Sequence, residues 1–131
     1  MFVSITNKGQ MKKLYDFLFA QQLDFEVCFP NDGTGEHDNE NPLVNGKQEI
    51  CAMSGVKIGV WDGMDNAIMV RGKLTEEAKT IFYRSLLDRG IWKYSFFRNG
   101  KEIVTVEDFD DVLLNLDKNE IETLRSLKVI D

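Results

Sequence analysis

The 131-residue sequence has few of the residues that most often carry out chemistry in proteins. It contains two Cys and one His. No CxxC motif or Cys/His pair accompanies Cys28 or Cys51, which argues against a disulfide framework and against a zinc cluster. No run of about 18 apolar residues and no secretory leader pattern is present. We therefore expect a cytoplasmic protein with two free thiols.

Basic residues are also in deficit. Lys and Arg number 16 against 22 Asp and Glu, which gives a net charge of −6. Contact with a nucleic-acid backbone or an anionic membrane surface needs a basic face, so neither is expected as a direct partner. Acidic composition permits a basic protein or a cation instead, or imitation of nucleic-acid phosphates. With 43% hydrophobic residues, residues 1–131 are expected to form a single domain.

Hydrophobic periodicity predicts most of the secondary structure. Helical spacing predicts helices that begin after the capping residues Asn7 and Thr75, and the second of these is expected to end at Gly90. Alternation of apolar and polar residues predicts strands at 23–29 and 56–61, and β-rich runs predict further strands at 2–6, 67–71, 91–97 and 102–106. Asp62-Gly63 and Asn99-Gly100 predict the turns of two hairpins.

The C-terminal quarter is interpreted as two short helices over about 106–128. Thr105 with Asp108 resembles a capping box, as does Asp117 with Glu120. Phe109, Val112, Leu113 and Leu116 have helical spacing, which leaves Leu114 on the outer side of the first helix. The expected order is β-α-β-loop-β-β-α-β-β-α-α. Such a mixture predicts an α+β two-layer sandwich, with a mostly antiparallel sheet and helices packed on one face.

The segment 31–48 is the part of the chain with the least regular pattern. Its roughly 18 residues exceed the usual length of a connection in a compact domain, and such loops are often binding loops or lids. It holds five of the residues we predict to contact a partner: Asp32, Glu36, His37, Asp38 and Glu40. The remaining two, Asp110 and Asp111, belong to the expected acidic helix.

Metal binding by this loop has weak support. Asp32 to Glu36 offers carboxylates and glycines that suit a hard cation, but the spacing matches neither a 12-residue calcium loop nor a phosphate-binding loop. His37 is flanked by carboxylates in a glycine-bearing loop, which fits a surface histidine better than a general base. We therefore predict no catalytic residues, no metal and no cofactor.

The strand at 91–97 carries Trp92, Tyr94 and Phe96 on one face. Packing beneath a helix is the interpretation we favour, because large aromatic side chains dominate cores. The alternative, a stacking platform for bases, needs a positive groove that this composition does not offer.

These observations favour a non-enzymatic regulator or inhibitor that presents the acidic loop and acidic helix to a basic surface of a larger protein. A phage-type or mobile-element inhibitor of a host or defence enzyme is one version. The alternative is a small-ligand-binding or divalent-metal-dependent hydrolytic domain that uses loop 31–48. A homodimer formed through the hairpin 92–106 is a third possibility.

Overall fold

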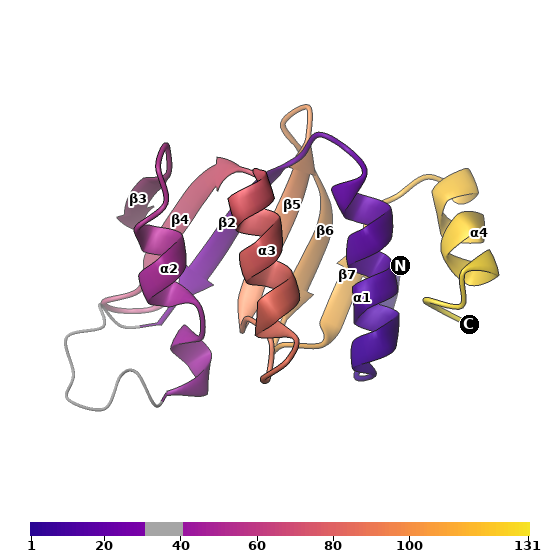
Figure 1. The fold of residues 1–131 in the computed structure, drawn as a ribbon, viewed down its shortest axis with the longest axis horizontal. Helices are drawn as coiled ribbons and strands as arrows, with labels where there is room; N and C mark the ends of the chain where they lie inside the picture. Colours follow the sequence, from indigo (N-terminus) through magenta and orange to yellow (C-terminus); the bar gives the residue numbers. More distant parts are fainter. Residues whose placement is uncertain (31–40) are drawn as a thin grey trace.

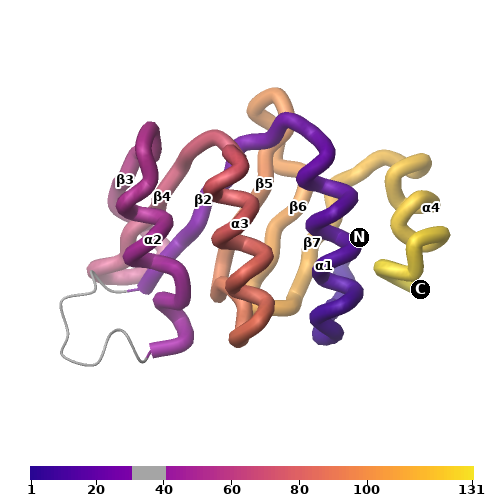
Figure 2. Tube along the Cα trace, viewed as in Figure 1, coloured from indigo at the N-terminus to yellow at the C-terminus, as the bar shows by residue number. Residues whose placement is uncertain are grey.

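The computed structural model describes residues 1–30 and 41–131, and it confirms the predicted α+β architecture. The described strands form one sheet in the order β1-β7-β6-β5-β2-β4-β3, and every neighbouring pair is antiparallel. The helices lie on one face of this sheet (Figures 1 and 2). Within the described residues, no helix is long and apolar enough to cross a membrane.

The elements have the following bounds. The strands are β1 (Phe2–Ser4), β2 (Asp24–Phe29), β3 (Lys57–Val60), β4 (Ile68–Lys73), β5 (Lys93–Arg98), β6 (Lys101–Glu107) and β7 (Asp111–Leu114). The helices are α1 (Lys8–Phe19), the short 3-10 helix η2 (Pro42–Val44), α2 (Lys47–Cys51), α3 (Glu76–Ser85) and α4 (Lys118–Ser126).

The core lies between the sheet and the helices, and it is rich in aromatic rings. Strand β2 faces it with Phe25, Val27 and Phe29, as the alternation predicted. Tyr94 and Phe96 of β5 are also buried there, which confirms the core interpretation for both residues, whereas Trp92 is half-buried and packs edge-on against Trp61. The rings of Tyr94 and Phe96 pack against aromatic rings of α1 and α3. The ring surfaces on which a base would stack are therefore covered by these helices.

Capping residues begin three of the helices where the sequence predicted. The side chain of Asn7 accepts from the Gln10 backbone N–H at 3.1 Å, and that of Thr75 accepts from Ala78 at 3.2 Å. Asp117 and Glu120 form a complete capping box at α4. These bonds satisfy backbone donors that a helix leaves unpaired in its first turn.

The predicted first C-terminal helix was wrong, because its residues form the end of β6 and the strand β7. Asp108 and Phe109 adopt positive φ values of 52° and 75°, which turn the chain back on itself and are incompatible with an α-helix. Thr105, the supposed cap, is buried in β6, with its hydroxyl 3.0 Å from that of Ser95. Leu114 faces the core, and it is Leu113 that is exposed.

Two further predictions need correction. Residues 42–51 belong to η2, α2 and the turn between them, so this described part of the predicted loop 31–48 is helical. The hairpin 92–106 does not lie at an edge of the sheet, because β5 pairs with β2 and β6 pairs with β7. A homodimer through a free edge of that hairpin is therefore excluded, since both of its strands already have two neighbours.

Candidate binding surfaces

The acidic residues predicted to contact a partner do not form one described surface. Asp32, Glu36, His37, Asp38 and Glu40 lie outside the described residues. Asp111 lies in β7, opposite Ser4 of β1 and Glu107 of β6. Asp110 belongs to the turn before β7, and its backbone carbonyl accepts a 2.8 Å hydrogen bond from Ile5. Both side chains are half-buried, and the helix expected to present them is absent.

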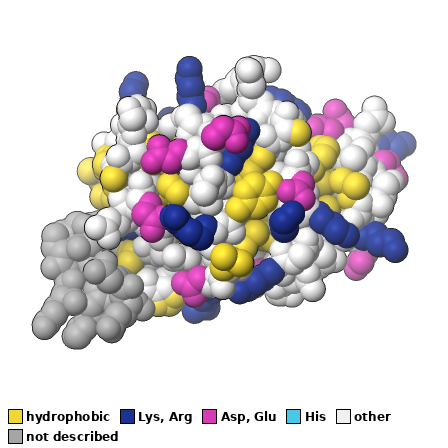
Figure 3. All heavy atoms as spheres, viewed as in Figure 1, with side chains coloured by type: hydrophobic (Ala, Val, Ile, Leu, Met, Phe, Trp, Pro, Cys, Tyr) yellow, Lys and Arg dark blue, Asp and Glu magenta, His cyan; other side chains and the backbone are white. Residues whose placement is uncertain are grey.

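An apolar depression lies between α1 and α3 on the helical face of the molecule. We call it the helical groove; it has a volume of about 950 Å³ and is lined by Lys8, Gly9, Lys12, Thr80, Tyr83, Arg84, Leu86 and Leu87. Figure 3 shows hydrophobic side chains over these helices with Lys and Arg side chains beside them. Leu87 follows α3 and is 85% exposed, the highest exposure among the large hydrophobic side chains of the described residues.

The floor of the groove is held by contacts between α1 and α3. The Tyr83 ring packs edge-on against Tyr15 and Phe19, with ring centroids 5.8 and 5.2 Å apart. Its hydroxyl donates a 2.6 Å hydrogen bond to Asp16. Burial, followed by this bond to a carboxylate, raises the pKa of Tyr83, and the same bond lowers the pKa of Asp16. The Tyr83 ring at the floor of the groove is therefore held in place by both helices.

The charged residues that line the helical groove are all basic. Lys12 pairs with Asp16 at 3.3 Å, Arg84 pairs with Glu49, and the Lys8 ammonium donates to the backbone carbonyl of Asp88. The two ion pairs are exposed on both sides, and such pairs contribute little to stability. Carboxylates of a binding partner can therefore replace these contacts at a small cost in free energy.

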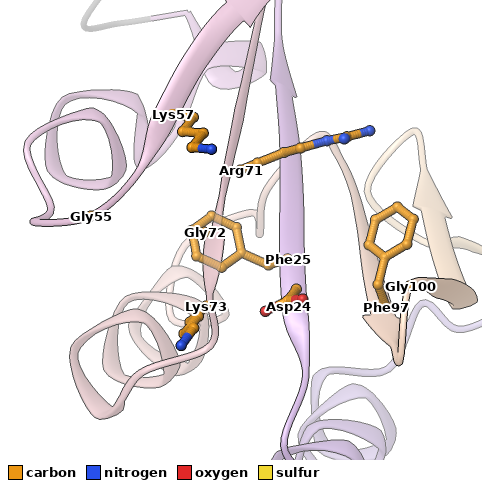
Figure 4. A pocket seen from close by; sticks show the side chains of 9 residues that line it. All are labelled: Asp24, Phe25, Gly55, Lys57, Arg71, Gly72, Lys73, Phe97 and Gly100. Atoms are coloured by element: carbon orange, nitrogen blue, oxygen red, sulfur yellow. The ribbon is translucent and has the colours of Figure 1, made fainter.

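A second depression, which we call the sheet pocket, lies on the face of the sheet opposite the helices (Figure 4). It has a volume of about 450 Å³ and is lined by Asp24, Phe25, Gly55, Lys57, Arg71, Gly72, Lys73, Phe97 and Gly100. Arg71 reaches from β4 across β2 toward Phe97, with 5.9 Å between the guanidinium carbon and the ring centroid. Arg71 also pairs with Glu26 at 2.6 Å. Because Arg71 already has two partners, the sheet pocket offers less positive charge than its three basic residues suggest.

The thiols are not placed for nucleophilic chemistry. Cys28 is buried on the outer side of β2, where burial and then the Glu26 carboxylate raise the pKa of the thiol to about 11. Burial also raises the pKa of Cys51. A reactive thiol needs the opposite shift. Among residues 1–30 and 41–131, no three His, Cys, Asp or Glu side chains lie together in a way that suits a metal ion.

Sequence reasoning missed the helical groove because its apolar residues do not follow the helical pattern. Tyr83 and Leu87 lie outside the inward face traced by Ala78, Ile81 and Phe82. The available signal was the pair of leucines Leu86-Leu87. The sequence predicted that this helix would end at Gly90, but α3 ends at Ser85, so Leu87 lies beyond it. Compared with protein-family models, curated proteins and solved structures, the chain matches none.

Proposed function

We propose that this chain is a non-enzymatic binding protein that regulates or inhibits a larger protein, and that it docks an amphipathic, acidic segment of that protein in the helical groove. The observation that carries the proposal is the 85% exposure of Leu87 beside an apolar depression of about 950 Å³. Contiguous apolar surface rimmed by polar residues is typical of interaction sites. A lone exposed leucine on a convex surface would not support such an inference.

The shape favours a helical occupant. Two neighbouring helices leave a furrow along their contact, and amphipathic helices dock their apolar face in grooves of this kind. The exposed Leu87 side chain and the Tyr83 ring supply apolar contacts of the type that anchors such helices.

The rim charges select the chemistry of that occupant. Lys8, Lys12 and Arg84 stand around an apolar floor, so an occupant with carboxylates flanking its apolar stripe makes complementary contacts. Because the whole chain carries a net charge of −6, only a segment that reaches this local basic rim gains from electrostatic attraction.

The test uses a photo-crosslinking amino acid at position 87 in the intact protein, with the same amino acid at Leu127 of the α4 end as the matched control. Leu127 is also exposed but lies outside the groove. We expect position 87 alone to label a host protein, and the labelled peptide to be an acidic amphipathic segment. That peptide, made synthetically, should bind the purified protein and lose affinity with Leu87→Asp but not Leu127→Asp. Labelling of a basic or non-amphipathic segment would contradict the proposal.

The acidic contact predicted from the sequence stays a separate part of the proposal. Replacing Asp32, Glu36, Asp38 and Glu40 with amides should weaken binding to a basic partner, and the affinity of the unaltered protein should fall as salt increases. Asp110→Asn with Asp111→Asn tests the second predicted region in the same assay. Unchanged affinity in both sets of variants would leave the groove as the sole contact.

The hydrolytic alternative also stays a prediction, since its residues lie in 31–40. It requires a melting temperature that rises with Mg²⁺, Mn²⁺, Ca²⁺ or Zn²⁺ and a rise that His37→Ala or Asp38→Asn abolishes. A melting temperature that none of these ions changes would count against it.

A further inference from the structure

Strand β3 is a free edge of the described sheet. Lys57–Val60 pairs with β4 on one side, and no other described strand pairs with it on the other side. All four of its residues are exposed. Natural sheets usually protect an edge with proline, a bulge, charge or a covering element, because unpaired backbone groups recruit further strands. The only charged residue in β3 is Lys57.

The backbone bonds of β3 show which groups point outward. The Trp61 N–H donates to the Ala67 carbonyl at 3.1 Å, in the same register that pairs Gly59 with Met69. In an antiparallel ladder, alternate residues bond to the same neighbour. Gly59 therefore bonds toward β4, and the N–H and C=O groups of Ile58 and Val60 point to the free edge.

The side chains at this edge are apolar. Ile58 is 53% exposed and Val60 is 76% exposed, although they lie opposite Val70 and Ile68 on the helical face of the sheet. The sequence pattern of β3 is thus that of a strand with one buried face. In the described structure neither side chain is covered, since all four residues of β3 are exposed.

We propose that β3 pairs with β3 of a second copy of this chain, antiparallel, around a twofold axis at Gly59. In this register Ile58 lies opposite the partner's Val60, and Val60 lies opposite the partner's Ile58. Each of these two pairs exchanges both backbone N–H···O=C bonds through the groups that point outward. The two sheets become one continuous sheet, with the apolar side chains of both edges on the helical side.

Self-pairing suits this strand better than a foreign strand because the register is complementary to itself. Gly59 lies opposite the partner's Gly59 at the axis, where the two backbones approach closely. Within one chain, a Cβ added at Gly59 would have no heavy atom within 4 Å, so the space beside this residue is open. Lys57 faces the partner's Trp61 instead of a second lysine, so no like charges oppose each other. Two short strands bury little area, so the dimer is expected to be weak and concentration-dependent.

The first test is sedimentation velocity of the full chain over a range of concentrations. We expect a monomer–dimer equilibrium in the unaltered protein, and Val60→Lys should raise its dissociation constant by about tenfold or more. The matched control is Phe2→Lys, which places the same charge at an exposed position of the opposite edge strand, β1. A protein that stays monomeric at every concentration, or a dimer that Phe2→Lys disrupts and Val60→Lys does not, would overturn the proposal.

The second test fixes the register and does not depend on the stability of the variant. Gly59→Cys, made with Cys51→Ser, should form a disulfide between two copies under mild oxidation, because facing residues without mutual backbone bonds lie close enough for one. Lys57→Cys is the control; its two copies are offset by four residues, about 13 Å along the strands. Equal crosslinking of the two variants, or none in Gly59→Cys, would overturn this register.

Discussion

At the scale of single residues, the hydroxyls of Tyr15 and Tyr94 form a buried polar pair in the core. Both side chains are buried, and their hydroxyls hydrogen-bond to each other across the interface between α1 and β5. No other described aromatic pair in the core shares a polar contact of this kind. A buried hydroxyl without a hydrogen-bond partner lowers the stability of the fold, so replacing either tyrosine with phenylalanine leaves the other hydroxyl unfavourably placed.

We predict that Tyr15→Phe lowers the free energy of unfolding by about 1–3 kcal/mol, because it leaves the Tyr94 hydroxyl buried without a partner. The double variant Tyr15→Phe/Tyr94→Phe should cost less than the sum of the two single variants. Urea unfolding of the four proteins in this cycle measures the difference. Strict additivity would show that the two hydroxyls do not stabilise each other.

The thiols give a second residue-scale prediction. In the folded protein, Cys51 should react faster with a thiol reagent than Cys28, because Cys28 is the more deeply buried and its pKa is raised to about 11. Mass spectrometry of peptides after timed labelling measures the two rates, and the unfolded protein provides the control in which they converge. Faster labelling of Cys28 in the native protein would contradict its placement.

At the scale of elements, α4 is attached to the sheet through Glu120. Its carboxylate receives two hydrogen bonds from Arg98 of β5, at 2.8 and 3.0 Å, and it also closes the capping box with Asp117. Arg98 bonds to Gln21 after α1 as well. One ion pair thus joins three parts of the chain, and the bond from Arg98 lowers the pKa of Glu120.

We predict that Glu120→Gln destabilises the protein by about 1–3 kcal/mol, since it removes a half-buried charged hydrogen-bond acceptor. Glu122→Gln is the matched control: it breaks an exposed pair with Arg125 on the same helix and should cost less than about 0.5 kcal/mol. Hydrogen exchange should show faster exchange in α4 for the first variant only. Equal effects of the two variants would mean that Arg98 does not anchor the helix.

How far the sequence predicted these elements depended on whether local and long-range preferences agreed. At α1 and α3, caps and helical spacing agree with burial, so both were predicted. At 109–116 the same residues fit a helix at one spacing and a strand at another, since Val112 and Leu114 also alternate. Backbone pairing with both β6 and β1 stabilises the strand at these residues. A local sequence pattern does not show which strands will be available for pairing. The groove and the free edge of β3 depend on what neighbouring elements leave uncovered, which a sequence pattern does not specify.

At the scale of the whole molecule, the shifted pKa values define a pH range of stability. Asp16 and Glu120 have lowered pKa values in the fold, so their contribution is present above the unfolded carboxyl pKa and is lost as pH falls through the folded values. Tyr15 and Tyr94 have raised pKa values, so the folded state keeps protons that the unfolded chain loses above about pH 10.

We therefore predict that the free energy of unfolding, measured by urea titration, is highest between these limits and declines below about pH 4 and above about pH 10. Glu120→Gln should flatten the acid side of the profile, and Tyr15→Phe/Tyr94→Phe should flatten the alkaline side. Profiles of the variants that parallel the unaltered protein would show that other groups control the decline.

The strand order has a consequence for how the chain is made. β1 leaves the ribosome before the other described strands and pairs, among them, only with β7, the last of them, whereas β5, β2, β4 and β3 lie side by side in the sheet and are separated by shorter stretches of chain. During synthesis the half of the sheet that contains β2 to β5 is complete first, and β1 waits without a pairing partner until residue 114 has emerged. A nascent chain stalled before β7 therefore exposes β1 to chaperones and proteases, and release of β7 ends that exposure in a single step.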